Sequence, residues 1–229
     1  MNQLATTAIV LTRTNYGEAD RIVTVLTPDH GKLRLMAKGV RRVKSKLAGG
    51  IELFSVSHIT FIKGRGDIST LVSSRLERYY GTIVQDIDRV QLGYDLIKLL
   101  NKTIEDEAEK EYFDLLEQAF LALDDAANSD ELVRMWFMAQ LLRLGGHTPN
   151  LQTDSFGEKL DPHASYEFDF DAMAFVQHDQ GQLTADHIKF MRLIFSGNPP
   201  RILRQVNGSE QLVQYCWPLV HRMFADTLS

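Results

Sequence analysis

The sequence has 229 residues, of which 44% are hydrophobic and 24% charged, a composition typical of a globular protein that can bury a sizeable core. It contains no apolar run of the roughly 18 residues that a membrane span requires, and its N-terminus predicts no signal peptide because it lacks a basic leader and a cleavage site. The single cysteine, Cys216, excludes an internal disulfide and a cysteine zinc cluster and favours a reducing, cytoplasmic location.

The charge is unevenly distributed along the chain. Residues 1–81 carry 13 Lys and Arg against 6 Asp and Glu, a net charge of +7, whereas residues 82–229 carry 12 against 24, a net charge of −12. Seven of the cations fall within residues 31–50, which contain no acid. This asymmetry predicts that the N-terminal part binds a polyanion. Chance unevenness on a solvated surface is the alternative.

Short segments rich in alternating and β-branched residues predict five strands in the first part of the chain. They cover residues 8–14, 21–28, 32–37, 54–63 and 67–80, and turn signals separate them. A break at 40–53 leaves room for one helical turn. Five short strands with a helix or loop between the third and the fourth predict an OB-type barrel over residues 1–81, with an SH3-like barrel as the alternative.

After Gly81 the apolar residues follow the helical period, which predicts an α-helical domain over residues 82–229. Asn128 and Glu131 resemble a capping box that opens a central helix, and Pro218 predicts a kink or a break in the last helix. Residues 147–182 are expected to be irregular, with a small hairpin around the alternating aromatic residues at 166–170. The predicted fold is therefore α+β, with a barrel domain followed by a helical domain that carries a hairpin insertion.

Signatures of catalysis are missing from the sequence. It contains no GxxxxGK[ST], GxSxG, HExxH or GxGxxG pattern, so we expect a protein that is not an enzyme and needs no cofactor. Acids and histidines do gather in the irregular region, at Asp154, Asp161, His163, Asp169, Asp171 and His178. Their spacing matches no metal-ligand pattern, so a solvated acidic hairpin is favoured over a metal site and metal-dependent hydrolysis is the weakest hypothesis.

The basic segment carries the positive evidence for function. Cations that converge on a groove neutralise phosphates, so the segment and its neighbouring strands predict a DNA-binding surface made of Arg34, Lys38, Arg41, Arg42, Lys44, Lys46, Lys63 and Arg65. Arg13 is a further candidate. Aromatic residues are few, and Phe54 and Phe61 are expected in the core, which favours a sequence-independent grip on phosphates of DNA or RNA. The alternative is a non-catalytic interaction module whose basic loop docks an acidic partner.

The order of residues from Gly17 to Gly49 resembles the N-terminal signature of the RecO family of bacterial recombination mediators. The matching positions are Gly17, Glu18, Ile22, Val23, Thr27, Gly31, Lys32, Ala37, Lys38, Gly39, Arg41, Arg42, Lys46, Leu47 and Gly49. Residues 131–151 are also similar to the central helix of the family. No single short motif carries the resemblance, which rests on the order of residues over this stretch.

The resemblance implies an N-terminal OB-fold, a helical C-terminal domain and a role in DNA repair and recombination after DNA damage. It implies binding of single- and double-stranded DNA, annealing of complementary strands coated by the single-strand-binding protein SSB, and action with RecR to load RecA in the RecFOR pathway, without nucleotide hydrolysis. The expected location is cytoplasmic and nucleoid-associated.

Two further expectations follow from the resemblance. Many relatives carry a four-cysteine zinc site after the central helix, but residues 147–182 contain no cysteine, so zinc should be absent and the aromatic residues should hold this region. Family members also bind the acidic, Phe-ended tail of SSB in the helical domain. Arg134 and Arg143 are candidates for that contact, with Leu142 as the pocket wall; plain surface arginines are the alternative.

Overall fold

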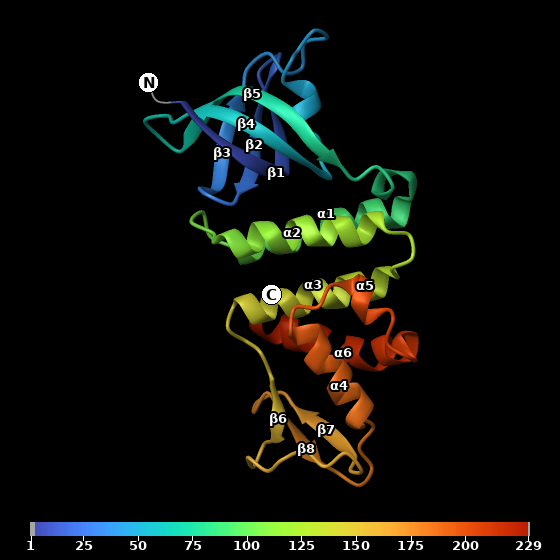
Figure 1. Cartoon of the computed structure of the whole chain (residues 1–229). Coiled ribbons are helices and arrows are strands. Elements are labelled where there is room, and N and C mark those ends of the chain that lie inside the picture. The colour runs from blue at the N-terminus through green and yellow to red at the C-terminus, as the bar shows by residue number, and fades with distance from the viewer. Residues whose placement is uncertain (1–2, 229) are drawn as a thin grey trace. The chain divides into compact units, whose positions relative to one another are not determined.

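The computed structural model describes residues 3–228 and shows two compact units, which divide between Asp125 and Ala126. The first unit contains the strands β1 (Gln3–Tyr16), β2 (Asp20–Thr27), β3 (Gly31–Ala37), β4 (Ser55–Ile62) and β5 (Ile68–Tyr79). They close into a barrel in the order β1-β2-β3-β5-β4 (Figure 1). β3 and β5 pair in parallel, and the antiparallel pairing of β1 with β4 completes the closure. The barrel is an OB-fold, so the predicted fold class is confirmed.

Alternating apolar residues on the strands fill the barrel. Val23 and Val25 on β2 and Leu35 and Ala37 on β3 are at most 1% exposed. They join one core cluster with side chains from β1, β4 and β5. Because successive side chains of a strand point to opposite faces, the residues between them face outward, and Arg34 on β3 is exposed.

The connection between β3 and β4 contains a 3-10 turn, η1 (Ala48–Gly50), where the sequence predicts room for a helical turn. Val40 and Ile51 insert into the barrel core near the two ends of this connection. The Ser74 hydroxyl on β5 donates to the Leu47 carbonyl at 2.9 Å. A Cβ at Gly50 would lie 2.5 Å from the Ser74 Cβ, so only glycine lets the connection lie this close to β5.

The first unit also contains η2 (Ile83–Gln85) and the helices α1 (Ile87–Thr103) and α2 (Lys110–Asp124). Aromatic rings join them to the barrel. The Phe54 ring lies 5.4 Å from Tyr94 of α1 and 5.6 Å from Phe120 of α2, and the Tyr80 ring lies 5.6 Å from Phe120. The change from strand to helix falls between Tyr79 and Ile83, while the compact unit continues through α2 because both helices help to bury these rings.

In residues 126–228, the second unit contains four helices and a small sheet. Its elements are α3 (Asp130–Leu144), β6 (Asn150–Asp154), β7 (Tyr166–Asp169), β8 (Ala174–Gln177), α4 (Ala185–Phe195), α5 (Pro200–Leu203) and α6 (Ser209–Leu228). β7 and β8 form the expected hairpin, and β6 adds a third strand parallel to β8. α6 runs through Pro218 as one helix, so the last helix is not split there.

The start of α3 differs from the prediction. The cap is Ser129, whose hydroxyl accepts from the Leu132 amide at 3.3 Å. The predicted cap at Asn128 is wrong, because that side chain is 2% exposed and accepts from Arg204 at 3.0 Å. Gly145 ends the helix as expected. Within residues 3–228, no helix is long and apolar enough to cross a membrane.

Aromatic packing holds the small sheet of the second unit. The Phe168 ring lies 5.2 Å from Phe175 and 5.1 Å from Phe170, and Tyr166 lies 6.2 Å from Phe175. The Tyr166 hydroxyl also accepts from the Asp161 amide at 2.7 Å. Edge-to-face contacts of this kind contribute energy beyond the area that the rings bury. The aromatic residues thus pack together in this region, as expected.

Candidate nucleic-acid interface

The basic loop, defined here as residues 38–46, is fixed to the turn between β1 and β2. The Gly39 amide donates to the Asp20 carboxylate at 2.7 Å, and the Arg41 amide donates to the Ala19 carbonyl at 2.9 Å. The Arg41 guanidinium adds a bond to the Gly17 carbonyl at 3.2 Å. The sequence predicts a loop free to follow a nucleic-acid backbone, whereas the structure anchors its first half to a neighbouring turn.

Local turns shape the rest of the basic loop. The Arg42 amide donates to the Gly39 carbonyl at 3.1 Å, and the Ser45 amide donates to the Arg42 carbonyl at 2.9 Å. The five cations of the loop are all exposed: Lys38, Arg41, Arg42, Lys44 and Lys46. None of them forms an ion pair with a residue that the structure describes. Their charge therefore has no ion-pair partner among these residues, and phosphate oxygens can bind there without breaking an internal ion pair.

The other predicted cations do not all lie beside the basic loop. Arg34 is opposite Ile68 in the parallel pair of β3 and β5. The basic loop comes after Arg34 along β3, whereas the turn with Lys63 and Arg65 comes before Ile68 along β5. At about 3.3 Å per residue, Lys38 is about 13 Å from Arg34 along the strand. The exposed cations therefore form two groups at opposite ends of this strand pair, with Arg34 between them.

Two basic side chains of the barrel already form hydrogen bonds and ion pairs within the protein. The Arg13 guanidinium donates to the Glu52 carboxylate at 2.8 Å, which neutralises it locally. The Lys32 ammonium donates to the Ile104 carbonyl at 2.8 Å and lies 3.6 Å from Asp106. Arg13 is therefore a weaker candidate for phosphate binding than the sequence suggests.

Two cations that the sequence does not single out lie near the basic loop. Arg21 is paired with Ala37, the residue just before the loop, and its guanidinium donates to Asn15 at 2.9 Å. Arg75 is exposed and follows Ser74, whose hydroxyl donates to the carbonyl of Leu47, the residue just after the loop. Pairing between distant strands places both of them, so no local sequence signal could have found them.

Exposed aromatic side chains on the barrel are scarce. Phe54 and Phe61 are 3% and 2% exposed and belong to the core, as predicted. Tyr16 is 56% exposed and precedes Gly17, whose carbonyl accepts from Arg41. Tyr16 is thus a candidate platform for a base beside the basic loop. Burial raises the pKa of Tyr80 to about 12, so that phenol stays neutral.

The structure does not bring the predicted partner-tail residues together on an open surface. Leu142 is 0% exposed, so it does not form the wall of an open pocket. Arg134 and Arg143 are nine residues apart on α3, which places them on opposite sides of the helix at 100° per residue. Arg134 is half-buried, and Arg143 donates to Gln140 at 2.8 Å. Their role in binding a partner tail stays a prediction.

The acidic residues of the irregular region form turns. The Asp154 carboxylate accepts from the Phe156 and Glu158 amides at 2.9 and 2.8 Å, and Asp169 accepts in the same way within the turn between β7 and β8. In the part of the chain that the structure describes, no group of three or more His, Cys, Asp or Glu side chains is placed to hold a metal ion. These carboxylates have a local structural role in turn formation.

Comparisons with known proteins identify the family. The model for the recombination protein O N terminal region matches residues 1–80, and the model for the recombination protein O C terminal region matches residues 84–212. The chain belongs to the RecO family. The two RecO models cover the barrel and nearly all of the helical part, in agreement with the resemblance seen in the sequence.

Curated RecO relatives give the same result. The DNA repair protein RecO of Rhodopirellula baltica is 35% identical over 147 residues, which cover 63% of this chain and 54% of the relative. The protein of the same name from Roseiflexus sp. is 37% identical, with 64% and 51% covered. That from Bifidobacterium longum subsp. infantis is 33% identical, with 63% and 62% covered. The aligned part thus spans about half to two thirds of the length of these relatives.

Proposed function

We propose that the chain is a non-enzymatic DNA-binding protein of recombinational DNA repair that binds single- and double-stranded DNA through its basic loop. The observation that carries the proposal is the set of five exposed loop cations, which have no ion-pair partner among the described residues and sit on a loop fixed to the barrel. The printed name of its relatives, DNA repair protein RecO, supports the same process. Binding of this kind releases counterions and falls steeply with salt.

We also propose a finer activity, which membership of the RecO family supports. The protein anneals complementary strands coated by SSB, acts with RecR to load RecA, and works in the cytoplasm on the nucleoid. A basic surface can bring two polyanions together by neutralising both, and annealing then needs no nucleotide hydrolysis. Contact with the acidic tail of SSB belongs to the helical part.

Strand annealing tests the proposal directly. Two complementary oligonucleotides coated with SSB are mixed with the protein, without nucleotide and in excess EDTA, and duplex formation is followed by fluorescence. We expect rapid annealing by the wild-type protein and a large loss when Lys38, Arg42, Lys44 and Lys46 are all changed to Gln. Lys189→Gln, which removes a cation from α4 in the second unit, should anneal like the wild type.

Failure of the folded wild-type protein to anneal, or equal loss in the control variant, would contradict the proposal. In that case the basic loop is better explained as a surface that docks an acidic protein. A salt series of DNA affinities separates these outcomes, because only a phosphate-binding loop loses salt dependence when its cations are removed.

A further inference from the structure

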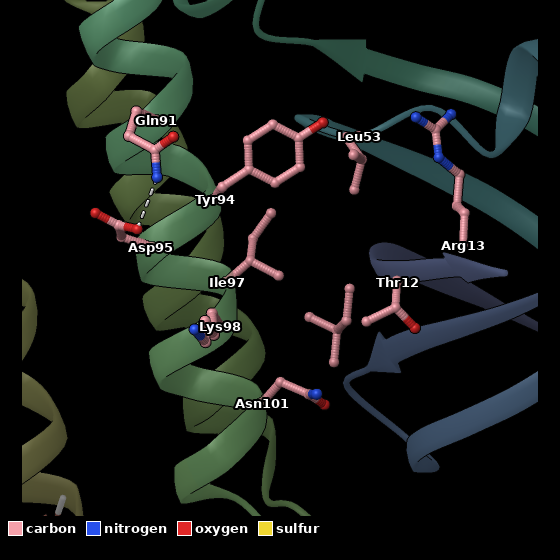
Figure 2. Close-up of a pocket in the computed structure, with 10 residues that line it drawn as sticks. Thr12, Arg13, Leu53, Gln91, Tyr94, Asp95, Ile97, Lys98 and Asn101 are labelled. Atoms are coloured by element: carbon pink, nitrogen blue, oxygen red, sulfur yellow. Dashed lines mark hydrogen bonds between the residues drawn. The ribbon is translucent and has the colours of Figure 1, made fainter.

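A pocket of about 510 Å³ lies within the first unit, between β1 and α1 (Figure 2). Leu11, Thr12 and Arg13 of β1 line one side, with Leu53 beside them. Residues from successive turns of α1 line the other side. Its volume is within the range of sites that hold small molecules or parts of larger ligands.

The path of β4 leaves this pocket open. β4 pairs with β1 only from Gln3 to Ile9, so the later residues of β1 have a strand partner only on the side of β2. The chain turns away at Phe54, which has a φ of 54°. Gly93 of α1 lies against the Phe54 ring, where a Cβ would be 2.5 Å from Cε1. This close approach fixes α1 next to the open edge of β1.

Polar side chains without partners gather in the pocket. Thr12, Tyr94, Lys98 and Asn101 form no side-chain hydrogen bond or ion pair with any described residue. By contrast, Arg13 is bound to Glu52, and Gln91 donates to Asp95 at 3.0 Å. The pocket therefore offers a free hydroxyl, a phenol, an ammonium and an amide on apolar walls. Together, these groups can bind an aromatic ligand that has polar edges and a negative charge.

Tyr94 is held so that part of its ring stays open. It packs edge-to-face on Phe54, with the ring centres 5.4 Å apart, and remains 45% exposed. Figure 2 shows that Tyr94 projects from α1 toward Leu53, and that Asn101 projects toward the β1 side of the pocket. Each of the four bases can stack on such a ring. An asparagine amide can both donate to and accept from the edge of a base. Lys98 supplies a positive charge one helical turn after Tyr94.

We propose that this pocket holds one nucleotide of a single strand of DNA. The base stacks on Tyr94, its edge hydrogen-bonds with Asn101 and Thr12, and the phosphate lies near Lys98. The inference rests on the proposed DNA-binding function and extends it, because bases of a duplex are paired and stacked and cannot enter. Arg13 is four residues from Gly17, or about 13 Å along β1, so a strand that crosses the basic loop can reach the pocket.

Photocrosslinking locates the base. The full chain is mixed with an oligothymidylate that carries one 5-iododeoxyuridine, irradiated, digested and analysed by mass spectrometry. We expect a crosslink at Tyr94, which Tyr94→Phe retains and Tyr94→Leu loses. Crosslinks confined to the basic loop or Tyr16 would overturn the inference. Labelling of Tyr94 by free 5-iododeoxyuridine monophosphate at concentrations as low as those of the oligonucleotide would also overturn it, in favour of a site for free nucleotides.

Affinity measurements separate this inference from the proposed function. Lys98→Gln, Asn101→Ala and Tyr94→Leu should each weaken binding of single-stranded DNA, by about tenfold where stacking is lost, and leave duplex affinity unchanged. Lys102→Gln, on the same helix but outside the pocket, is the matched control. If basic-loop variants lose DNA binding while these pocket variants do not, the inference fails and the proposed function stands. If the wild-type protein binds no DNA, both fail.

The alternative, that an extended peptide binds along the open edge of β1, predicts a different result. Such a ligand would bind mainly through the backbone of β1, so Asn101→Ala and Lys98→Gln would have no effect on single-stranded DNA. Circular dichroism of each variant confirms that the fold is intact before affinities are compared. Loss of affinity by a variant that remains folded then reports on the pocket itself.

Discussion

The side chains of two adjacent arginines of the basic loop differ in their hydrogen bonds. The Arg41 guanidinium donates to the Gly17 carbonyl at 3.2 Å, and its amide donates to the Ala19 carbonyl at 2.9 Å. The Arg42 side chain is exposed and makes no such bond. Because a guanidinium has five N–H donors, Arg41 can still bind phosphate while it fixes the loop. We infer that Arg41 both positions the loop and binds its ligand, whereas Arg42 only binds.

Changing each arginine to Gln separates the two roles. Both variants should reduce the slope of log affinity against log salt by about 0.7 on single-stranded DNA, since each loses one phosphate contact. Only Arg41→Gln should also lower the free energy of unfolding, by up to about 1 kcal/mol, because it removes a hydrogen bond. Fluorescence anisotropy in a salt series and urea titration measure these quantities. Equal stability of the two variants would contradict the anchoring role, and unchanged slopes would remove both residues from the interface.

At the scale of elements, the sequence predicts what is local. The alternation of Val23 and Val25 predicts β2, and the dense run of cations predicts the basic loop. The parallel pairing of Arg34 with Ile68 depends on closure of the whole barrel, and no local pattern signals it. The same limit applies to the candidate site. The bond from the Gly39 amide to Asp20 joins residues 19 positions apart, so the anchoring of the loop could be seen only in three dimensions.

Helix α4 begins with a capping box that uses histidine. The Thr184 amide donates to Nδ1 of His187 at 3.0 Å, and this nitrogen can accept only while it carries no proton. Burial lowers the pKa of His187, and the nearby Asp186 carboxylate opposes the shift to a smaller extent. The folded state thus favours the neutral ring, which is the form that completes the cap.

This arrangement predicts a stability that depends on pH. As the pH falls through about 6.5, the usual histidine pKa, the unfolded chain binds a proton that the folded chain excludes, so the free energy of unfolding decreases until the lowered pKa of the folded state is passed. His187→Gln keeps an acceptor at the capping position and does not titrate. Urea titrations of both proteins between about pH 5 and 8 should show a smaller decrease for the variant. Identical pH profiles would show that His187 contributes nothing to the effect.

At the scale of the whole molecule, both proposed DNA contacts belong to the first compact unit. The basic loop lies on the barrel, and the nucleotide pocket needs α1 as well as β1. The barrel also depends on the helices for burial: Phe54 and Tyr80 are 3% and 1% exposed and pack against Phe120 of α2. The Lys32 amide donates to the Asp106 carbonyl at 2.8 Å, in the connection between the two helices. We therefore expect the strands and helices of this unit to fold together.

Two truncated chains test this dependence. Residues 1–125 should fold on their own, unfold in one cooperative transition and bind single-stranded DNA with the affinity of the full chain. Residues 1–81 should be poorly folded, because loss of α1 and α2 exposes Phe54 and Tyr80, at about 2 kcal/mol each, against a total stability of about 5–15 kcal/mol. Thermal unfolding by circular dichroism and the dispersion of amide NMR signals distinguish these outcomes. A well-dispersed spectrum and full DNA affinity for residues 1–81 would show that the barrel stands alone and that the helical pocket is not needed for binding.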